Sequence, residues 1–364
     1  MFKIMLKKNL LYILFILTFF YIIGCSQDTV TNTPVITSQG VLVLCEGGFS
    51  TPGDYSFINT KNDSVNNNVF ANSNSGATLG LIPDGMALSL QYLYICVQGT
   101  YGGPGKMYRL TQSDNKLVNT SIDFGTNPYD IVLANNYFYV TNIAGSTVTK
   151  IDQNLNIVRA GIRVQRNPSQ IITALRSIYV AQQSYYYGDS LAVINFFNDA
   201  VTYTVLPGTP VSVAFNEGVV FVSSYGHKKI YSLDTTITNK ILDSIPVNVP
   251  LNAIGDIVAG DYNTLYIVGI DDTTYGGYIG KKVYRLNLDT KQIDNSFLIQ
   301  MTGNDDIYGI AYEGSVNKLL YIGNSRGGAL NGEVKVYTTT GTLLKTYTLG
   351  EKYPHKFVFK YGNN

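Results

Sequence analysis

The sequence predicts an all-β protein, a seven-bladed β-propeller of four-stranded blades, and three features of the chain lead to this prediction. A short apolar strand with an aromatic residue at its centre recurs six times, at steps of 40 to 55 residues. A second apolar segment lies a short distance before each copy. Incomplete copies lie at the two ends of the repeat region and complement each other. All-β repeats of about this length are typical of propeller blades.

The central aromatic residues identify the second strand of each blade. They are Tyr94, Tyr139, Tyr179, Phe221, Tyr266 and Tyr321. The segment before each of them marks the first, innermost strand. These segments begin at Pro83, Pro128, Pro168, Pro210, Ile254 and Ile307. Because a proline at the first residue of a strand removes no ladder hydrogen bond, we place these residues at the strand starts.

Third strands follow with alternating apolar and polar residues, the pattern of half-buried strands. Clear examples are residues 106–110, 147–151, 229–233 and 282–286. Turn-forming residues then separate each third strand from a fourth, outer strand. Four strands make one propeller blade.

The two ends of the repeat region predict how the ring closes. Residues 41–44, 55–58 and 64–70 supply a second, third and fourth strand without a first. Residues 354–359 supply a first strand without the others. We therefore expect the C-terminal strand to pair with the N-terminal blade and complete a seventh blade, which leaves no open sheet edge.

The first 24 residues have the pattern of a signal peptide. Three lysines, at positions 3, 7 and 8, precede an apolar stretch over residues 10–23. That stretch is short for a membrane span and has the right length for the apolar region of a signal peptide.

The residues that end this segment, Ile22-Ile23-Gly24-Cys25, resemble a bacterial lipobox. The resemblance implies cleavage before Cys25 and acylation of that residue; an ordinary signal anchor with a chance cysteine is the alternative. Ser26 resembles the residue found in lipoproteins sorted to the outer membrane. Residues 25–39 are then the lipidated cysteine and a flexible tether, and residues 40–364 the propeller.

The charge of the chain excludes one class of function, and the spacing of the two remaining cysteines predicts their redox state. The net charge is +1 and only 14% of the residues are charged, so no basic stripe for nucleic acid is present. Cys45 and Cys96 occupy equivalent positions in neighbouring blades. Export permits a disulfide, but such positions are normally too far apart for one, so we expect two buried free thiols.

One copy of the repeat carries a family resemblance. Tyr139-Val140-Thr141-Asn142, followed by residues 146–152, resembles the YVTN repeat of bacterial and archaeal seven-bladed propellers. The other copies are degenerate. The resemblance implies the fold for the whole chain after the tether, but propellers host many unrelated activities.

Loops after the second strands are rich in glycine and tyrosine, and together with residues entering the first strands they predict a binding face. Tyrosine offers a large, rigid contact area with a polar tip, and glycine lets backbone approach a ligand closely. The candidate ligand-binding residues are Phe49, Tyr101, Tyr129, Tyr185, Tyr186, Tyr225, His227, Tyr275, Tyr308, Arg326 and His355. The alternative is that a chain with 29 tyrosines and no tryptophan places tyrosines on every face.

Ring closure predicts a smaller cluster at the mouth of the central channel. The residue after the first position of each inner strand should line this mouth, which places His355 between Asp84 and Tyr308. A Tyr–His–Asp arc has the composition of an acid–base site, although a histidine beside a carboxylate is more often structural. No known catalytic motif is present, and no metal site or cofactor is predicted.

The favoured reading is a non-enzymatic, lipid-anchored propeller of the bacterial outer membrane that captures a small molecule, a glycan or a protein. The layout resembles surface propeller lipoproteins, a resemblance that implies a corrinoid ligand and an outer-membrane transporter as partner. A second reading is an enzyme, because other propellers resemble a metal-assisted lyase of cyclic peptide antibiotics, with His355 and Glu46 or Asp84 as candidates. A third reading is a scaffold in an envelope complex.

Overall fold

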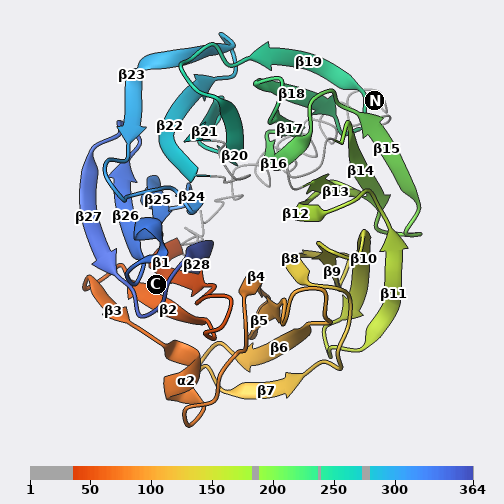
Figure 1. The fold of residues 1–364 in the computed structure, drawn as a ribbon, viewed down its shortest axis with the longest axis vertical. Coiled ribbons are helices and arrows are strands. Elements are labelled where there is room, and N and C mark those ends of the chain that lie inside the picture. The colour runs from red at the N-terminus through yellow and green to blue at the C-terminus, as the bar shows by residue number, and fades with distance from the viewer. Residues whose placement is uncertain (1–35, 183–187, 237–238, 273–278, 364) are drawn as a thin grey trace, which may run out of the picture. The chain divides into compact units, whose positions relative to one another are not determined.

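The computed structural model describes residues 36–182, 188–236, 239–272 and 279–363. They form seven four-stranded antiparallel sheets that follow one another around a ring (Figure 1). The unit Thr37–Gly362 holds these sheets, and most of the second unit, Met1–Ile36 with Asn363–Asn364, lies outside the described residues. The predicted fold class is confirmed.

The blades are numbered here from the first complete repeat. Blade 1 contains β4 (Pro83–Leu88), β5 (Tyr92–Val97), β6 (Lys106–Thr111) and β7 (Leu117–Thr120). Blade 2 contains β8 (Pro128–Ala134), β9 (Tyr137–Asn142), β10 (Thr147–Asp152) and β11 (Ile157–Arg163). Blade 3 contains β12 (Pro168–Ala174), β13 (Ser177–Gln182), β14 (Ser190–Asn195) and β15 (Val201–Val205), and blade 4 contains β16 (Pro210–Asn216), β17 (Val219–Ser224), β18 (Lys229–Asp234) and β19 (Ile241–Pro246). Blade 5 contains β20 (Ala253–Ala259), β21 (Thr264–Asp272), β22 (Ile279–Asn287) and β23 (Gln292–Gln300); blade 6 contains β24 (Gly309–Glu313), β25 (Leu319–Asn324), β26 (Glu333–Thr338) and β27 (Leu343–Thr348); blade 7 contains β28 (Pro354–Asn363), β1 (Ile36–Cys45), β2 (Asp54–Asn59) and β3 (Ser64–Asn66).

The tyrosines at the centre of the second strands fill the space between neighbouring blades. The side chains of Tyr94, Tyr139 and Tyr179 are fully buried. Their hydroxyl groups still reach the turn between the third and fourth strands of the next blade. Tyr94 donates to the Gln153 carbonyl at 3.0 Å, and Tyr139 donates to Asp199 at 2.9 Å. A buried ring with a satisfied hydroxyl explains why the repeat favours tyrosine over phenylalanine.

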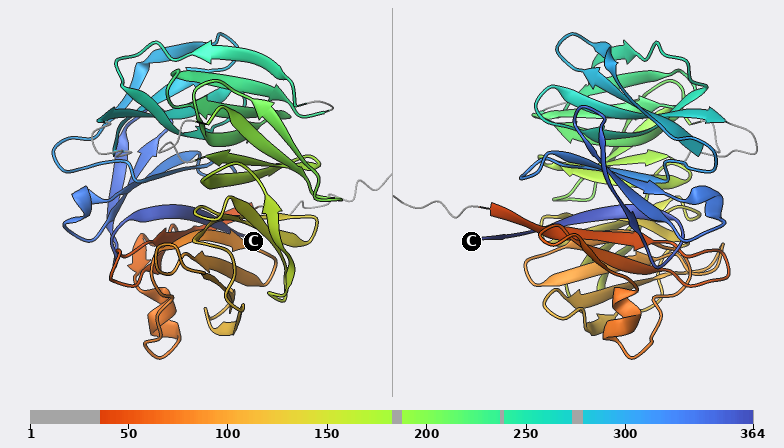
Figure 2. Two further views of the ribbon diagram at one scale, coloured as in Figure 1. Left: turned by 45° about the vertical axis from the view of Figure 1, so that its right-hand side comes forward. Right: turned by 90° about the vertical axis from the view of Figure 1, so that its left-hand side faces the viewer.

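Blade 7 closes the ring as the sequence predicts. Its sheet has the order β28-β1-β2-β3, and Figure 2 shows β28 and β1 side by side. Backbone bonds continue the junction beyond the strands, because Glu46 N–H donates to the Tyr353 carbonyl at 3.1 Å. A strand from the C-terminal end of the ring therefore completes the N-terminal blade.

The fourth strand of blade 7 differs from the prediction. Residues 64–70 were expected to be a strand, but β3 ends at Asn66 and helix α2 (Val69–Ser73) follows. Asp54 at the start of β2 accepts hydrogen bonds from the backbone of Phe70 and Ala71, at 2.9 and 3.0 Å. This carboxylate satisfies N–H groups in the first turn that would otherwise have no partner.

Three further features complete the fold. A short 3₁₀ helix, η2 (Arg326–Gly328), lies in the loop after β25. Cys45 and Cys96 are buried free thiols, as expected, and burial raises the pKa of both. Among the described residues, no helix has the length and apolar character needed to cross a membrane.

Candidate functional site

A cavity of about 650 Å³ lies at the centre of the ring of inner strands. Six of the seven residues predicted at the channel mouth line it: Tyr129, Ser169, Val211, Gly255, Tyr308 and His355. The seventh, Asp84, is fully buried and contacts His355. In blades 1 to 5 the pairing of the first and second strands shifts register near the strand start. Such bulges redirect side chains, which explains how successive residues reach the cavity.

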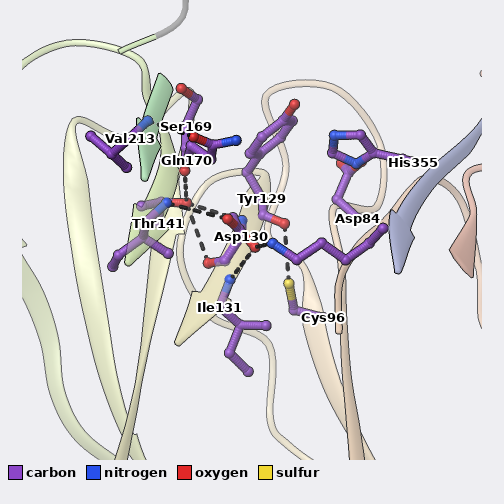
Figure 3. Close-up of polar contacts among 12 residues, drawn as sticks. Asp84, Cys96, Tyr129, Asp130, Ile131, Thr141, Ser169, Gln170, Val213 and His355 are labelled. Atoms are coloured by element: carbon purple, nitrogen blue, oxygen red, sulfur yellow. Dashed lines mark hydrogen bonds and ion pairs between the residues drawn. The ribbon is translucent and has the colours of Figure 1, made fainter. Parts of the chain in front are cut away.

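Three ionisable side chains meet on one side of this cavity. His355 Nδ1 lies 3.3 Å from Asp84 Oδ1 and 3.7 Å from Glu46 Oε1. Figure 3 shows the His355 ring next to Asp84, with Tyr129 alongside. His355 lies on β28, Asp84 lies on β4 and Glu46 directly follows β1, so two neighbouring blades build the cluster. We call Glu46, Asp84 and His355 the acid–histidine cluster.

Each carboxylate of the acid–histidine cluster has one oxygen held by a donor outside it. The Tyr308 hydroxyl donates to Glu46 Oε2 at 2.6 Å, and the Gln98 amide donates to Asp84 Oδ2. Asp84 Oδ1 and His355 Nδ1 are buried and have no hydrogen-bond partner. Tyr308 and Gln98 therefore fix the carboxylates so that their other oxygens face the imidazole.

Burial is the main reason why the pKa values of both acids are raised. The pKa of Glu46 is raised well above its usual value, first by burial and then by the negative charge of Asp84. Burial also raises the pKa of Asp84, to about 7. Two acids with raised pKa values beside a histidine are a common arrangement at catalytic and ion-binding sites, and structural networks produce it as well.

The acid–histidine cluster has a composition and spacing that fit a divalent cation. Its three ligand atoms all lie within 4.8 Å of one another. Neighbouring ligands about 2.0–2.2 Å from a tetrahedral zinc ion are themselves roughly 3.3–3.6 Å apart. The unpartnered Asp84 Oδ1 and His355 Nδ1 supply two such ligands. Outer hydrogen bonds that fix one carboxylate oxygen, as Tyr308 and Gln98 do, are also typical of metal sites.

Aromatic rings surround the His355 side of the cavity. The Tyr129 and Tyr308 rings have centroids 5.6 and 6.0 Å from the His355 ring, and the Tyr353 ring lies 5.1 Å from Tyr308. All four side chains line the cavity. They offer flat, amphipathic contact area next to the carboxylates.

Two glycines allow the inner strands on either side of this region to approach closely. A Cβ at Gly309 would collide with the backbone of Pro354 and His355. A Cβ at Gly85 would collide with the Cys96 sulfur and with Ile131. Only glycine fits at these positions without displacing a neighbour, so both glycines support the geometry of the site.

The predicted ligand-binding residues divide into two groups in the structure. Tyr129, Tyr308 and His355 line the cavity. Phe49 and Tyr101 lie at exposed loop positions, with 90% and 88% of their surface accessible, and neither lines the cavity. His227 is exposed, Tyr225 is half-buried in the same loop, and Arg326 forms an ion pair with Glu333 at 3.4 Å.

Four predicted residues lie outside the described residues. They are Cys25, Tyr185, Tyr186 and Tyr275. Their proposed roles in lipidation and ligand binding remain predictions.

The sequence prediction did not assign cavity-lining roles to the residues that directly follow the predicted channel-mouth residues on the inner strands. Asp130, Asp256 and Lys356 line the cavity, and Lys356 donates to Asp130 at 2.5 Å. Tyr353, just before β28, was also missed. The sequence contained a signal for these residues, because charged residues recur at the third position of the otherwise apolar inner-strand segments.

Comparisons with known proteins bear on the fold. No family model and no curated protein matches the chain. Among solved structures, it is similar to a periplasmic gluconolactonase from Pseudomonas aeruginosa, with TM-score 0.65 and 10% identity over 89% of this chain and 99% of that one. It is also similar to a quinoprotein alcohol dehydrogenase-like protein from Bacteroides thetaiotaomicron, with TM-score 0.64 and 18% identity over 88% of this chain and 78% of the other.

A third similar structure is virginiamycin B lyase from Staphylococcus aureus, with TM-score 0.55 and 13% identity over 74% of this chain and 85% of that one. At such low identities these similarities bear on architecture and not on activity. Together with the seven four-stranded sheets, they establish that the chain is a seven-bladed β-propeller.

Proposed function

We propose that this protein is a lipid-anchored propeller of the bacterial outer membrane that captures a ligand in its central cavity without transforming it. The observation that carries the proposal is the cavity of about 650 Å³, whose wall combines Tyr129, Tyr308, Tyr353 and His355 with buried carboxylates. Ligand pockets of roughly this size take small molecules, and aromatic walls with a few polar groups suit amphipathic ones.

The identity of the ligand and its delivery are part of the same proposal. A corrinoid, a glycan or a peptide would fit the amphipathic wall, and an outer-membrane transporter is the partner that would receive a captured nutrient. Acylation at Cys25 would hold the propeller at the membrane. The loop face with Phe49 and Tyr101 is then available for the partner, because these side chains lie outside the cavity.

Replacing Tyr129 by alanine tests whether the cavity is the binding site. We expect the variant to lose at least about fivefold in affinity, since one stacked ring contributes about 1–3 kcal/mol in comparable aromatic sites. The measurement is calorimetric titration with cyanocobalamin, maltoheptaose and a cyclic depsipeptide as probes. Tyr101→Ala is the matched control, because this tyrosine is exposed and outside the cavity. Loss of affinity in the Tyr101 variant alone would move the site to the outer loops.

The acid–histidine cluster favours a second candidate function, a lyase acting on a cyclic peptide. Glu46 and Asp84 are placed to hold a divalent cation, and His355, when it does not coordinate that cation, is placed beside them to take up a proton. A bound cation would polarise a carbonyl oxygen of the substrate. The similarity to virginiamycin B lyase shows the same fold in an enzyme of this kind, at 13% identity.

Incubation of the purified protein with a virginiamycin B-type depsipeptide and magnesium tests this candidate. If the protein is a lyase, mass spectrometry will detect the linear product, and His355→Ala will lower the rate at least a hundredfold. His227→Ala is the matched control, because it removes an exposed histidine away from the cavity. An intact depsipeptide after prolonged incubation, or equal rates in the two variants, would reject the lyase reading.

A further inference from the structure

In several blades, the side chain at the third position of the inner-strand segment accepts a hydrogen bond from the backbone of the next blade. Asp130 of blade 2 accepts a hydrogen bond from the Ile171 N–H of blade 3 at 3.2 Å. Two further bonds repeat the pattern: Val213 N–H of blade 4 donates to Gln170 of blade 3 at 2.8 Å, and Ile257 N–H of blade 5 donates to the Ser212 hydroxyl of blade 4 at 3.0 Å. Figure 3 labels three of these residues, Asp130, Gln170 and Val213. Three successive blades thus use this side chain as a structural link.

Asp256 of blade 5 holds the same position and breaks the pattern. By analogy its carboxylate should accept the Ile310 N–H of blade 6, yet no hydrogen bond or ion pair engages it within the described part of the chain. The side chain lines the cavity instead. Among the described residues, Asp256 therefore takes no part in linking blades, and its carboxylate can contact a ligand in the cavity.

The other charged groups around the cavity do not neutralise Asp256. Lys356 is engaged by Asp130 at 2.5 Å, and His355 contacts Glu46 and Asp84. Asp306 accepts the Ser325 backbone N–H at 2.7 Å. The described cavity wall thus keeps an excess of carboxylates over cations. Burial raises the pKa of Asp256, and the positive charges of His355 and Lys356 lower it only in part.

We propose that the ligand captured in the cavity carries an organic cation, an ammonium or guanidinium group, that pairs with Asp256 while the rings of Tyr129 and Tyr308 contact the rest of the molecule. This inference rests on the proposed capture function and names the chemical class of its ligand. A carboxylate without a partner next to aromatic rings is the arrangement that recognises quaternary ammonium and guanidinium groups. The same wall disfavours anionic ligands, because they would be repelled by the Asp256 carboxylate.

The test compares two probes of the same shape and different charge. Choline carries a quaternary ammonium, and 3,3-dimethylbutan-1-ol replaces its nitrogen by carbon. Binding to the full-length protein is measured by calorimetry or NMR titration at low ionic strength, with a chelator present so that no divalent metal competes. We expect choline to bind about tenfold more tightly than the alcohol.

Asp256→Asn then assigns the effect to one residue. We expect this variant to lose at least fivefold in choline affinity, to keep its affinity for the alcohol within about twofold, and to keep its melting temperature. Asp123→Asn is the control for the general loss of one negative charge, because Asp123 is exposed, does not line the cavity and pairs with Lys106 at 3.4 Å. The control is expected to bind choline like the parent protein.

The outcomes separate this inference from the capture function. Equal affinities for the two probes, both lowered by Tyr129→Ala, would overturn the cation inference and leave capture in the cavity intact. Equal choline affinity in the Asp256 and Asp123 variants would overturn the role of Asp256. Absence of binding by both probes would overturn the cation inference, and the corrinoid, glycan and peptide titrations would then decide on capture alone.

Discussion

A chain that ends at Tyr353 is expected to lose most of the stability of the propeller. The deletion removes β28, the innermost strand of blade 7, and leaves the edge of β1 without a partner. It also removes Phe357, which is 8% exposed and packs in the core cluster with Val41 and Val43. Lost apolar burial and lost strand pairing together amount to roughly 5 kcal/mol or more.

Thermal or urea unfolding of the truncated and full-length proteins measures this loss. A chain that ends at Gly362 is the matched control, since it keeps nearly all of β28 and should melt within a few degrees of the full-length protein. Addition of a synthetic peptide with the sequence of residues 354–364 should restore part of the stability, because a free strand can pair with an open edge. Equal melting temperatures of the two truncated chains would contradict ring closure by β28.

Ring closure could be predicted because its signals are local. The repeat spacing, the strand-initiating prolines and the aromatic centres each depend on a few neighbouring residues. Equivalent positions in a repeat protein then lie in equivalent places, which is why the arc of Asp84, Tyr308 and His355 could be assembled before any coordinates were known. In the structure, His355 contacts Asp84 directly. Glu46 connects His355 to Tyr308, because it contacts the imidazole and accepts a hydrogen bond from the Tyr308 hydroxyl.

The features that the sequence did not predict depend on contacts between distant residues. Helix α2 begins where it does because Asp54, at the start of β2, accepts hydrogen bonds from N–H groups in the first turn of the helix. Asp256 resembles Asp130 in sequence, but Asp130 accepts hydrogen bonds from the Ile171 N–H and from Lys356, whereas no described residue forms a hydrogen bond or ion pair with Asp256. Tyr101 and Phe49 were assigned to a binding face on composition; both are exposed and lie outside the cavity, and their role in binding stays a prediction.

Asp84→Asn is expected to make the protein more stable at neutral pH. Asp84 has no exposed surface, and burial raises its pKa from 3.8 to about 7 in the folded protein. A raised pKa means that the folded state holds the proton more tightly than the unfolded state does. The stabilising contribution of this group is therefore complete below about pH 4, and it is lost as the pH rises through about 7.

Asparagine cannot ionise, so the variant avoids this loss. Its side-chain oxygen can accept the Gln98 amide, and its amide can face the unpartnered His355 Nδ1. The difference in free energy of unfolding between Asp84→Asn and the parent should grow from near zero at pH 4 to roughly 2–4 kcal/mol above pH 7. Urea unfolding across this pH range, with a chelator present, measures the difference.

Asp63→Asn is the control variant, because the pKa of Asp63 is shifted in the opposite direction to that of Asp84. Hydrogen bonds from Lys345 and Tyr347 lower the pKa of this exposed acid, so its removal should cost a little stability above pH 4 and leave the pH trend of the Asp84 comparison unchanged. A parent protein as stable as Asp84→Asn at pH 8 would show that Asp84 is not held as an unfavourable buried charge.

The same variant links stability to function. Natural proteins keep unfavourable buried charges mainly where a ligand or a reaction needs them, and removing such a charge typically stabilises the protein while it impairs the site. If Asp84→Asn is both more stable and deficient in ligand binding or in depsipeptide cleavage, the deficiency cannot be explained by misfolding. The acid–histidine cluster would then be the working part of the cavity, because its most buried carboxylate lowers stability and contributes to function at the same residue.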